Sequence, residues 1–186
     1  TKFDHVKSKR QVGSTFKPIL YAQALESGID PCKHWPNEHI TYEEFDNWAP
    51  KNVDDEYGGY YNMENALKRS INTIAVQVIL EMKVDSVRQM AKRMGIESPI
   101  PKEAANALCG GGLPVLEMVG AFATIANRGK RPVLHYITKV ETKDGEVVKG
   151  FGPPKAKSFT TAMSEMHADM MIYFLTKVVD SQGGTA

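Results

Sequence analysis

The sequence is poor in the features that define several classes of protein. It has two cysteines in 186 residues, too few for the disulfide framework of small secreted domains. No apolar run approaches the roughly 20 residues that cross a bilayer, and no repeat or low-complexity tract is present. The formal net charge is +1, so no strong field of one sign attracts nucleic acid. These absences leave an ordinary globular composition, whose function has to be sought in particular residues.

The cysteines and histidines do not suggest a metal centre. Cys32 is followed by His34 and His39, but this C-x-H-x4-H spacing, even with Cys109 added, matches no standard zinc site. The remaining histidines are scattered along the chain at His5, His135 and His167. We therefore expect no metal and no cofactor.

Hydrophobic periodicity predicts a mainly helical chain with one β-hairpin. The expected helices cover about 15–27, 62–70, 71–83, 85–95, 114–129 and 162–180. The Ile and Val content of 71–83 would also suit a strand, but its length favours a helix. Their starts are expected at Asn62, Asp85 and Pro114, and their ends at Gly28, Gly95 and Gly129. Alternating residues on both sides of Asp144-Gly145 predict the hairpin. The last helix carries methionines at helical spacing, expected to pack in the core: Met163, Met166, Met170 and Met171.

Two segments have no helical pattern. Residues 29–62 hold both tryptophans and four of the seven tyrosines, and a loop of this length inside a compact domain is usually functional or disordered. The aromatic residues argue for function. Residues 98–114 form a turn-rich connector, and the basic stretch 7–10 is expected to be a solvated strand end.

Ser14 and Lys17 lie three residues apart at an expected helix start, in "RQVGSTFKP". This spacing puts both side chains on one face of a helix. A serine hydroxyl needs a base to become a nucleophile, and a lysine amine can serve if burial and hydrogen bonding keep it neutral when needed. The helix N-terminus adds N–H groups that stabilise an oxyanion. A capped helix start is the plainer interpretation of the same residues.

Ser70 and Asn72 form a second candidate pair, in "KRSINT". The plain interpretation makes Ser70 the cap of the apolar helix that begins at Ile71. In the functional interpretation, Ser70 relays a proton to a leaving amine while Asn72 holds a substrate amide and braces the lysine. Such pairs are frequent by chance, so neither motif decides the matter alone.

The order of the motifs does decide it. "RQVGSTFKPILYAQALESG", then "ALKRSINTIAVQV", then "LPVLEMVGAFATIANRGKRPVLHYITKVETKDGEVV" resemble the transpeptidase domain of penicillin-binding proteins, closest to the class A, bifunctional type. That family has a G-S-[small]-F-K-P block, an S-x-N block, a P-L-E-M-A-x-A-Y-A-T-x-A-N-G-G block and a hairpin, in this order. The resemblance covers nearly the whole chain, from about Lys9 to Ala186.

The resemblance implies a serine D,D-transpeptidase that cross-links peptidoglycan stem peptides. Ser14 would be the acylated nucleophile, Lys17 its proton acceptor, and Ser70 and Asn72 the second motif. The stretch "WAPKN" would lead towards the S-x-N helix, so Trp48 and Tyr60 are expected to border the cleft and contact substrate. The expected partners are a stem peptide ending in D-Ala-D-Ala and β-lactam antibiotics, with no nucleic acid.

The family's third motif, K-[ST]-G, is absent from the sequence. The nearest string, Lys143-Asp144-Gly145, has Asp in place of the hydroxyl and belongs to the expected hairpin turn. We therefore expect residues 1–186 to be the central, mainly helical lobe of the α/β β-lactamase/transpeptidase-like fold, with most of the five-stranded sheet and the K-[ST]-G strand lying outside the chain. Such a lobe is expected to be close to inactive alone.

The resemblance to penicillin-binding proteins also implies the remaining expectations. Glu103 and Asn106 have the wrong spacing for the E-x-x-L-N loop with which class A β-lactamases deacylate. The parent protein would act at the extracytoplasmic (periplasmic) face of the bacterial cytoplasmic membrane, anchored by a segment outside this chain and joined to an upstream glycosyltransferase domain. The alternative is a non-catalytic protein: a penicillin-recognising sensor or a helical interaction module.

Overall fold

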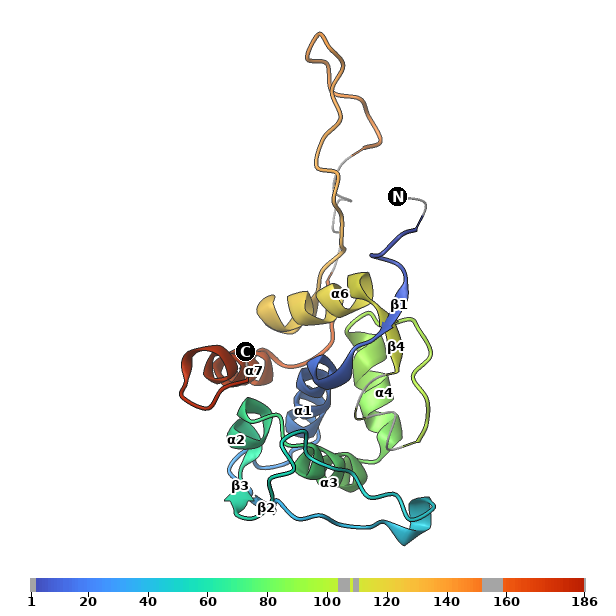
Figure 1. Ribbon diagram of the computed structural model, residues 1–186. Helices are drawn as coiled ribbons and strands as arrows, with labels where there is room; N and C mark the ends of the chain where they lie inside the picture. The colour runs from blue at the N-terminus through green and yellow to red at the C-terminus, as the bar shows by residue number, and fades with distance from the viewer. Residues whose placement is uncertain (1–2, 104–107, 109–110, 152–158, 186) are drawn as a thin grey trace.

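The computed structural model describes residues 3–103, 108, 111–151 and 159–185, which form helices around one central helix. After the strand β1 (Lys9–Gln11) comes a 3-10 turn, η1 (Gly13–Phe16), which leads into α1 (Lys17–Glu26). The other helices are α2 (Met63–Lys68), α3 (Asn72–Met82), α4 (Val84–Arg93), α6 (Val115–Ala126) and α7 (Glu165–Asp180). Helices α2, α3, α4 and α7 all contact α1, which Figure 1 shows at the centre of the body.

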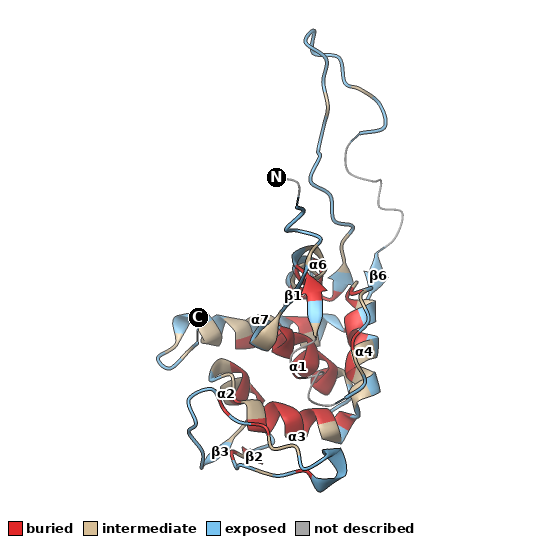
Figure 2. Cartoon of the chain, turned by 45° about the vertical axis from the view of Figure 1, so that its right-hand side comes forward, coloured by how far each residue is buried: buried red, intermediate tan, exposed pale blue. Residues whose placement is uncertain are grey.

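Helix α1 is central because its sequence is apolar on every side. All its residues from Lys17 to Leu25 are buried, as the red ribbon of Figure 2 shows. A helix without a polar face has to be surrounded by other elements. Lys17 is the charged member of this buried run, so its ammonium needs polar partners inside the protein.

The strands are short and pair in twos. β1 lies antiparallel to β4 (Gly112–Pro114), with Arg10 opposite Leu113. The other two pairs are β2 (Trp35–Pro36) with β3 (Tyr60–Tyr61), and β5 (Lys130–Arg131) with β6 (Thr160–Thr161). Between β5 and β6 the chain leaves the body as a long arm (Figure 1), and its hairpin is closed by one bridge between Glu141 and Val147. The predicted mainly helical fold with a hairpin at Asp144-Gly145 is confirmed, whereas the strand β4 inside the expected connector was not predicted.

Most helix boundaries agree with the sequence predictions. Asn62 caps α2 by accepting a hydrogen bond from the Asn65 N–H at 3.0 Å, and Gly28 and Gly95 follow the last turns of α1 and α4 with positive φ. Gly129 follows α6, and a Cβ at this position would collide with the Met163 carbonyl oxygen. Here only glycine fits, because the segment that leads into α7 crosses directly over the helix end.

Three predictions need correction. Asp85 does not cap α4: the helix begins at Val84, and Asp85 lies in its first turn, where it pairs with Arg88 at 2.6 Å. Ser70 does not cap α3, whose N-cap position is occupied by Ile71 without a side-chain hydrogen bond. Met166 is not in the core, since 65% of it is exposed, whereas Met163 and Met171 are buried.

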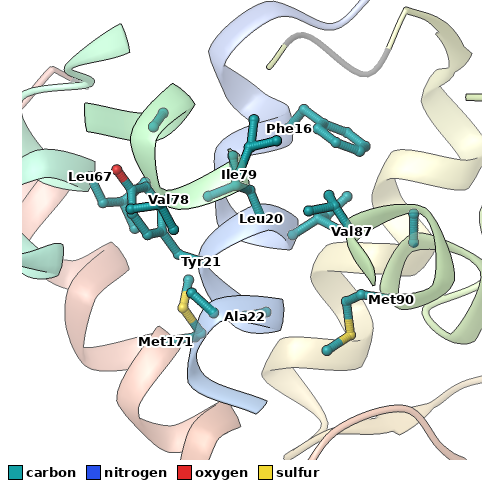
Figure 3. Packing of buried hydrophobic residues seen from close by; sticks show 14 of the residues in the cluster. Phe16, Leu20, Tyr21, Ala22, Leu67, Val78, Ile79, Val87, Met90 and Met171 are labelled. Atoms are coloured by element: carbon teal, nitrogen blue, oxygen red, sulfur yellow. The ribbon is translucent and has the colours of Figure 1, made fainter. Parts of the chain in front are cut away.

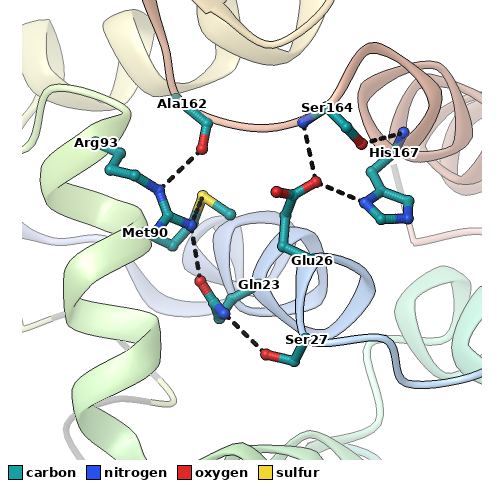
Figure 4. A network of polar contacts seen from close by, with 8 residues as sticks. All are labelled: Gln23, Glu26, Ser27, Met90, Arg93, Ala162, Ser164 and His167. Carbon is teal, nitrogen blue, oxygen red and sulfur yellow. Dashed lines mark hydrogen bonds and ion pairs between the residues drawn. The ribbon is translucent and has the colours of Figure 1, made fainter.

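A polar network joins α1, α4 and the segment before α7 (Figure 4). Arg93 donates to the Ala162 carbonyl at 2.9 Å and to Gln23 Oε1 at 3.0 Å. Glu26 Oε1 accepts from the Ser164 N–H at 2.9 Å and lies 2.6 Å from His167 Nδ1. Burial raises the pKa of the Glu26 carboxyl, but these hydrogen bonds outweigh it and hold the pKa below its ordinary value. The network therefore fixes the N-terminal end of α7 relative to the central helix α1.

The core contains one buried hydroxyl without a hydrogen bond. Tyr21 lies among Leu67, Val78 and Met171 (Figure 3), and its Oη has no hydrogen-bond partner among the described residues. Burial raises the pKa of the phenol well above its ordinary value. An unsatisfied buried polar group costs about 1–3 kcal/mol.

Tyr21→Phe should therefore stabilise the protein. Removing the hydroxyl removes the unsatisfied group and leaves the ring packing intact, so the free energy of unfolding should rise by about 1 kcal/mol. Urea unfolding measures the change, with Tyr173→Phe as the matched control, because Tyr173 is 49% exposed and its hydroxyl can bond to water. A Tyr21→Phe protein less stable than the unsubstituted one would show that the hydroxyl has a partner.

Candidate functional site

The four residues predicted to carry the chemistry come from the starts of α1 and α3. Ser14 is exposed in the 3-10 turn that precedes α1, where Gly13 adopts a positive φ of 53°. Lys17 begins α1 and is only 1% exposed. Ser70 and Asn72 lie on the two sides of Ile71, at the junction of α2 and α3. The structure brings Lys17, Ser70 and Asn72 into direct contact and places Ser14 and Ser70 on the wall of one cavity.

Lys17 is the centre of the site. Its Nζ donates to the Ser70 carbonyl oxygen at 2.5 Å, to Ser70 Oγ at 2.9 Å and to Asn72 Oδ1 at 2.7 Å. A buried ammonium without hydrogen bonds would be strongly destabilising, and three oxygen acceptors compensate for its lost hydration. These acceptors lie 53 and 55 residues away in the sequence, so this contact joins the two motifs that the sequence separates.

Ser70 has an unusual backbone. Its φ is 55°, in the left-handed region that glycine normally occupies. The reason is the way α2 ends: the Ser70 N–H bonds to the Leu67 carbonyl and the Ile71 N–H to the Ala66 carbonyl, both at 2.9 Å. This pair of hydrogen bonds is the Schellman motif of a helix end, which requires a left-handed residue at the Ser70 position. The turn directs both the carbonyl and the hydroxyl of Ser70 at Lys17.

Asn72 is held in one amide orientation by its two partners. Its Nδ2 donates to the Lys51 carbonyl at 2.8 Å, and its Oδ1 accepts from Lys17 at 2.7 Å. Because the carbonyl of Lys51 can only accept, the amide nitrogen must face it and the oxygen must face Lys17. The backbone carbonyl of Lys51 thus determines that the oxygen of the Asn72 amide, and not its nitrogen, faces Lys17.

A cavity of about 470 Å³ opens beside this cluster. Ser14 and Ser70 lie on its wall together with Tyr57, Tyr61 and Arg69. The Arg69 guanidinium sits 5.3 Å from the centre of the Tyr61 ring, and the acids Asp54 and Glu56 lie on the same wall. The cavity therefore offers a cation, two carboxylates and aromatic faces next to a serine hydroxyl.

The two predicted substrate contacts do not line this cavity. Trp48 packs against Tyr42, with ring centres 6.1 Å apart, and Tyr60 is 69% exposed. Neither is among the residues that line this cavity or the apolar one on the other side of Ser14 and Ser70. Tyr61 takes the place of Tyr60, because successive residues of a strand point to opposite faces; the sequence located the segment and not the face.

Tyr57 is the second aromatic residue on the cavity wall. Its hydroxyl donates to Asp55 Oδ1 at 2.9 Å. Desolvation, this hydrogen bond and the charge of Asp55 raise the pKa of the Tyr57 phenol, so the group stays a neutral hydrogen-bond donor at physiological pH.

The residues considered for a metal do not come together where the structure describes them. Among the described residues, no three side chains of His, Cys, Asp and Glu are grouped closely enough to hold a metal ion. Cys109 and Asn106, which entered the metal and β-lactamase interpretations, lie outside the described residues. Glu103 is exposed.

The sequence did not reveal the residues that hold the site in place. Asn37, Asn52 and Thr73 are 5%, 7% and 2% exposed and are hydrogen-bonded to one another, and Asn37 and Asn52 also line the cavity. One signal was available: Ile71 cannot cap a helix with its side chain, so a cap for α3 had to come from elsewhere.

The left-handed conformation of Ser70 gives a stability test. Ser70→Gly and Ser70→Ala both remove the hydroxyl, but only glycine adopts this φ without strain, so Ser70→Gly should be the more stable by about 1 kcal/mol. Urea unfolding of both variants measures the difference. At Ser86 in α4 the order should be reversed, because glycine weakens a helix relative to alanine. Equal stability of the two Ser70 variants would contradict the strain argument.

The fold and the site together define a class: a domain with a serine three residues before a buried lysine that contacts a second serine and an asparagine. The family model for the penicillin binding protein transpeptidase domain matches residues 2–186. Penicillin-binding protein 1A of Neisseria gonorrhoeae is 32% identical over 155 residues, which cover 76% of this chain and 18% of that protein. The chain belongs to the penicillin-binding protein transpeptidase family.

Solved structures agree in fold. Penicillin-binding protein 1A of Haemophilus influenzae matches with a TM-score of 0.84 and 25% identity, covering 98% of this chain and 32% of that one. The PonA1 protein of Mycobacterium tuberculosis in complex with penicillin V matches with a TM-score of 0.77 and 26% identity, covering 92% and 48%. This chain spans about a fifth of the length of the curated relatives it matches. Among the described residues, no helix is long and apolar enough to span a membrane.

Proposed function

We propose that this chain is the central part of a peptidoglycan D,D-transpeptidase that works through a serine acyl-enzyme. The contact of Lys17 with Ser70 and Asn72 is the observation that carries the proposal. A buried lysine that contacts one serine of the cavity wall and lies three residues after another is suited to proton transfer from a serine hydroxyl. The penicillin V complex of the Mycobacterium tuberculosis relative supports the assignment of a β-lactam-binding site.

In the first step, Ser14 Oγ attacks the carbonyl carbon of the penultimate D-Ala of a stem peptide. The hydroxyl proton passes to Lys17, in its neutral form, as the new C–O bond forms. Ser70 Oγ, 2.9 Å from Lys17 Nζ, then carries a proton to the leaving amine of the terminal D-Ala. The C–N bond breaks and the acyl group stays on Ser14.

In the second step, the amine of another stem peptide attacks the acyl carbon. The new C–N bond forms, the ester C–O bond to Ser14 breaks, and the amine's proton returns through Ser70 and Lys17 to Ser14 Oγ. The product is a cross-link between the two peptides. A β-lactam resembles the D-Ala-D-Ala end, so it acylates Ser14 by the same first step. Tyr57 and Tyr61, which line the cavity, are the proposed substrate contacts.

The whole protein is proposed to act on the extracytoplasmic face of the bacterial membrane, because its proposed substrate is peptidoglycan. An anchoring segment and a glycosyltransferase domain would lie outside residues 1–186, as would the K-[ST]-G strand. Such a strand would provide the clamp for the substrate carboxylate and a second oxyanion donor.

The whole protein should be labelled covalently by a fluorescent penicillin at Ser14. Ser14→Ala should abolish labelling, because the proposal makes Ser14 the acylated residue and assigns the other hydroxyl at Lys17, Ser70 Oγ, to proton transfer. Gel fluorescence and peptide mapping measure the adduct, and Ser86→Ala, a serine on α4, is the matched control that should label normally. Labelling of the Ser14→Ala protein at an unchanged rate would refute the assignment of the nucleophile.

Residues 1–186 alone should label very slowly under the same conditions. Loss of one oxyanion-hole donor typically lowers a rate by about 10²–10³, and this sequence contains no K-[ST]-G string to supply the donor and the carboxylate clamp. Stoichiometric labelling of Ser14 in the isolated chain would contradict this expectation.

A non-catalytic sensor that binds penicillin is the alternative. Its acyl adduct would form at Ser14 as well, so labelling does not separate the two. Release of D-Ala from a stem pentapeptide, with formation of a cross-linked dimer, occurs only in the enzyme.

A further inference from the structure

Helix α3 begins without a cap of its own. Its N-cap residue, Ile71, offers no side-chain acceptor, and the amide oxygen of Asn72 is directed to Lys17. The first backbone N–H groups of a helix need acceptors from outside the helix. Here the acceptor comes from a residue 20 positions earlier: Asn52 Oδ1 accepts from the Asn72 N–H at 3.0 Å and from the Thr73 N–H at 3.2 Å.

Asn52 is itself held by a closed ring of hydrogen bonds. Its Nδ2 donates to Asn37 Oδ1 and to the Glu56 carbonyl, both at 2.7 Å. Thr73 Oγ1 donates to the same Asn37 oxygen at 2.7 Å, which closes the ring. Because Asn37 Oδ1 and the Glu56 carbonyl are both acceptors, the amide nitrogen of Asn52 must face them. The amide oxygen then faces α3, so the orientation of Asn52 is determined by its neighbours.

The ring also ties the start of α3 to the cavity wall. The Asn37 backbone pairs with the two residues that follow Tyr57. Its carbonyl accepts from the Gly58 N–H at 2.6 Å, and its N–H donates to the Gly59 carbonyl at 3.0 Å. The residue before Asn52, Lys51, supplies the carbonyl that orients the Asn72 amide. Positions 51 and 52 thus fix both the backbone and the side chain of Asn72.

We propose that Asn52 is a positioning residue of the acyl-transfer site: it caps α3 from outside the helix and so holds Asn72 and Ser70 against Lys17. This inference rests on the proposed function of Lys17, Ser70 and Asn72. Asn52 does not act on the substrate carbonyl in this proposal. Loss of its cap releases the first turn of α3, and Asn72, one of the acceptors of the lysine, moves with that turn.

Two substitutions in the whole protein separate the two roles of the Asn52 amide: its oxygen caps α3, and its nitrogen bonds to Asn37 and to the Glu56 carbonyl. Asn52→Ala removes both, whereas Asn52→Asp keeps an oxygen that accepts from the two α3 amides and loses the donors to Asn37 and Glu56. The Asn37 amide can rotate to present its nitrogen to the new carboxylate. Ser164→Ala is the matched control, because it removes the side-chain cap of α7, a helix end outside the site.

Acylation by a fluorescent penicillin and amide hydrogen exchange are the readouts. Asn52→Ala should lower the acylation rate constant about tenfold or more, since small displacements of catalytic groups have large effects on rate. The dissociation constant of the penicillin should change little. Asn52→Asp and Ser164→Ala should acylate close to the unsubstituted rate. Exchange at Asn72 and Thr73 should be slow in the unsubstituted and Asp proteins and fast in the Ala protein.

Several results would overturn the proposal. These are unchanged acylation by folded Asn52→Ala, an Asp variant as slow as the Ala variant, or an equal loss in Ser164→Ala. If Asn52→Ala does not fold, fast exchange of the Asn72 and Thr73 amides in the unsubstituted protein overturns it instead. Failure of the unsubstituted protein to acylate at all would refute the proposed function, while the exchange data would still decide whether Asn52 caps α3.

Discussion

The burial of the Lys17 ammonium is the constraint on which the rest of the structure depends. The residue opens the helix that forms the centre of the core, and it is 1% exposed. A charge in that position is tolerated only with acceptors around its head group. The junction of α2 and α3 supplies them, so the core cannot assemble around α1 without also assembling the site. Packing and chemistry therefore share one helix.

The irregular segment between β2 and β3 has a structural role as well as a place on the cavity wall. Asn37 and Asn52 tie it to the start of α3 through buried hydrogen bonds, and its residues Tyr57 and Glu56 line the cavity. Buried side-chain amides are stabilising only when both ends of each amide have partners. That requirement explains how a segment with almost no regular secondary structure holds one conformation next to Ser14.

The sequence predicted the local features and missed the long-range ones. The S-x-x-K and S-x-N spacings, the Asn62 cap and the glycine helix ends depend on neighbours within a few residues. The cap from Asn52 crosses 20 residues, and no periodicity in a loop indicates such a contact. The face of β3 that meets the cavity depends on its pairing with β2, so Tyr60 was chosen over Tyr61. The α-helical lobe was predictable because its helices are amphipathic or wholly apolar.

Violations of local rules are informative here only in combination. Ser70 has a positive φ, but so do Lys83 and Arg128, which lie at helix ends away from the cavity. What distinguishes Ser70 is that three exceptions meet there: a left-handed serine where glycine fits better, a helix start without its own cap, and a buried lysine. Each is unfavourable alone: the lysine is satisfied by Ser70 and Asn72, and the helix start by Asn52. A purely structural helix junction would remove all three with a glycine, a serine cap and an apolar residue, so their coincidence is itself an argument that the junction serves chemistry.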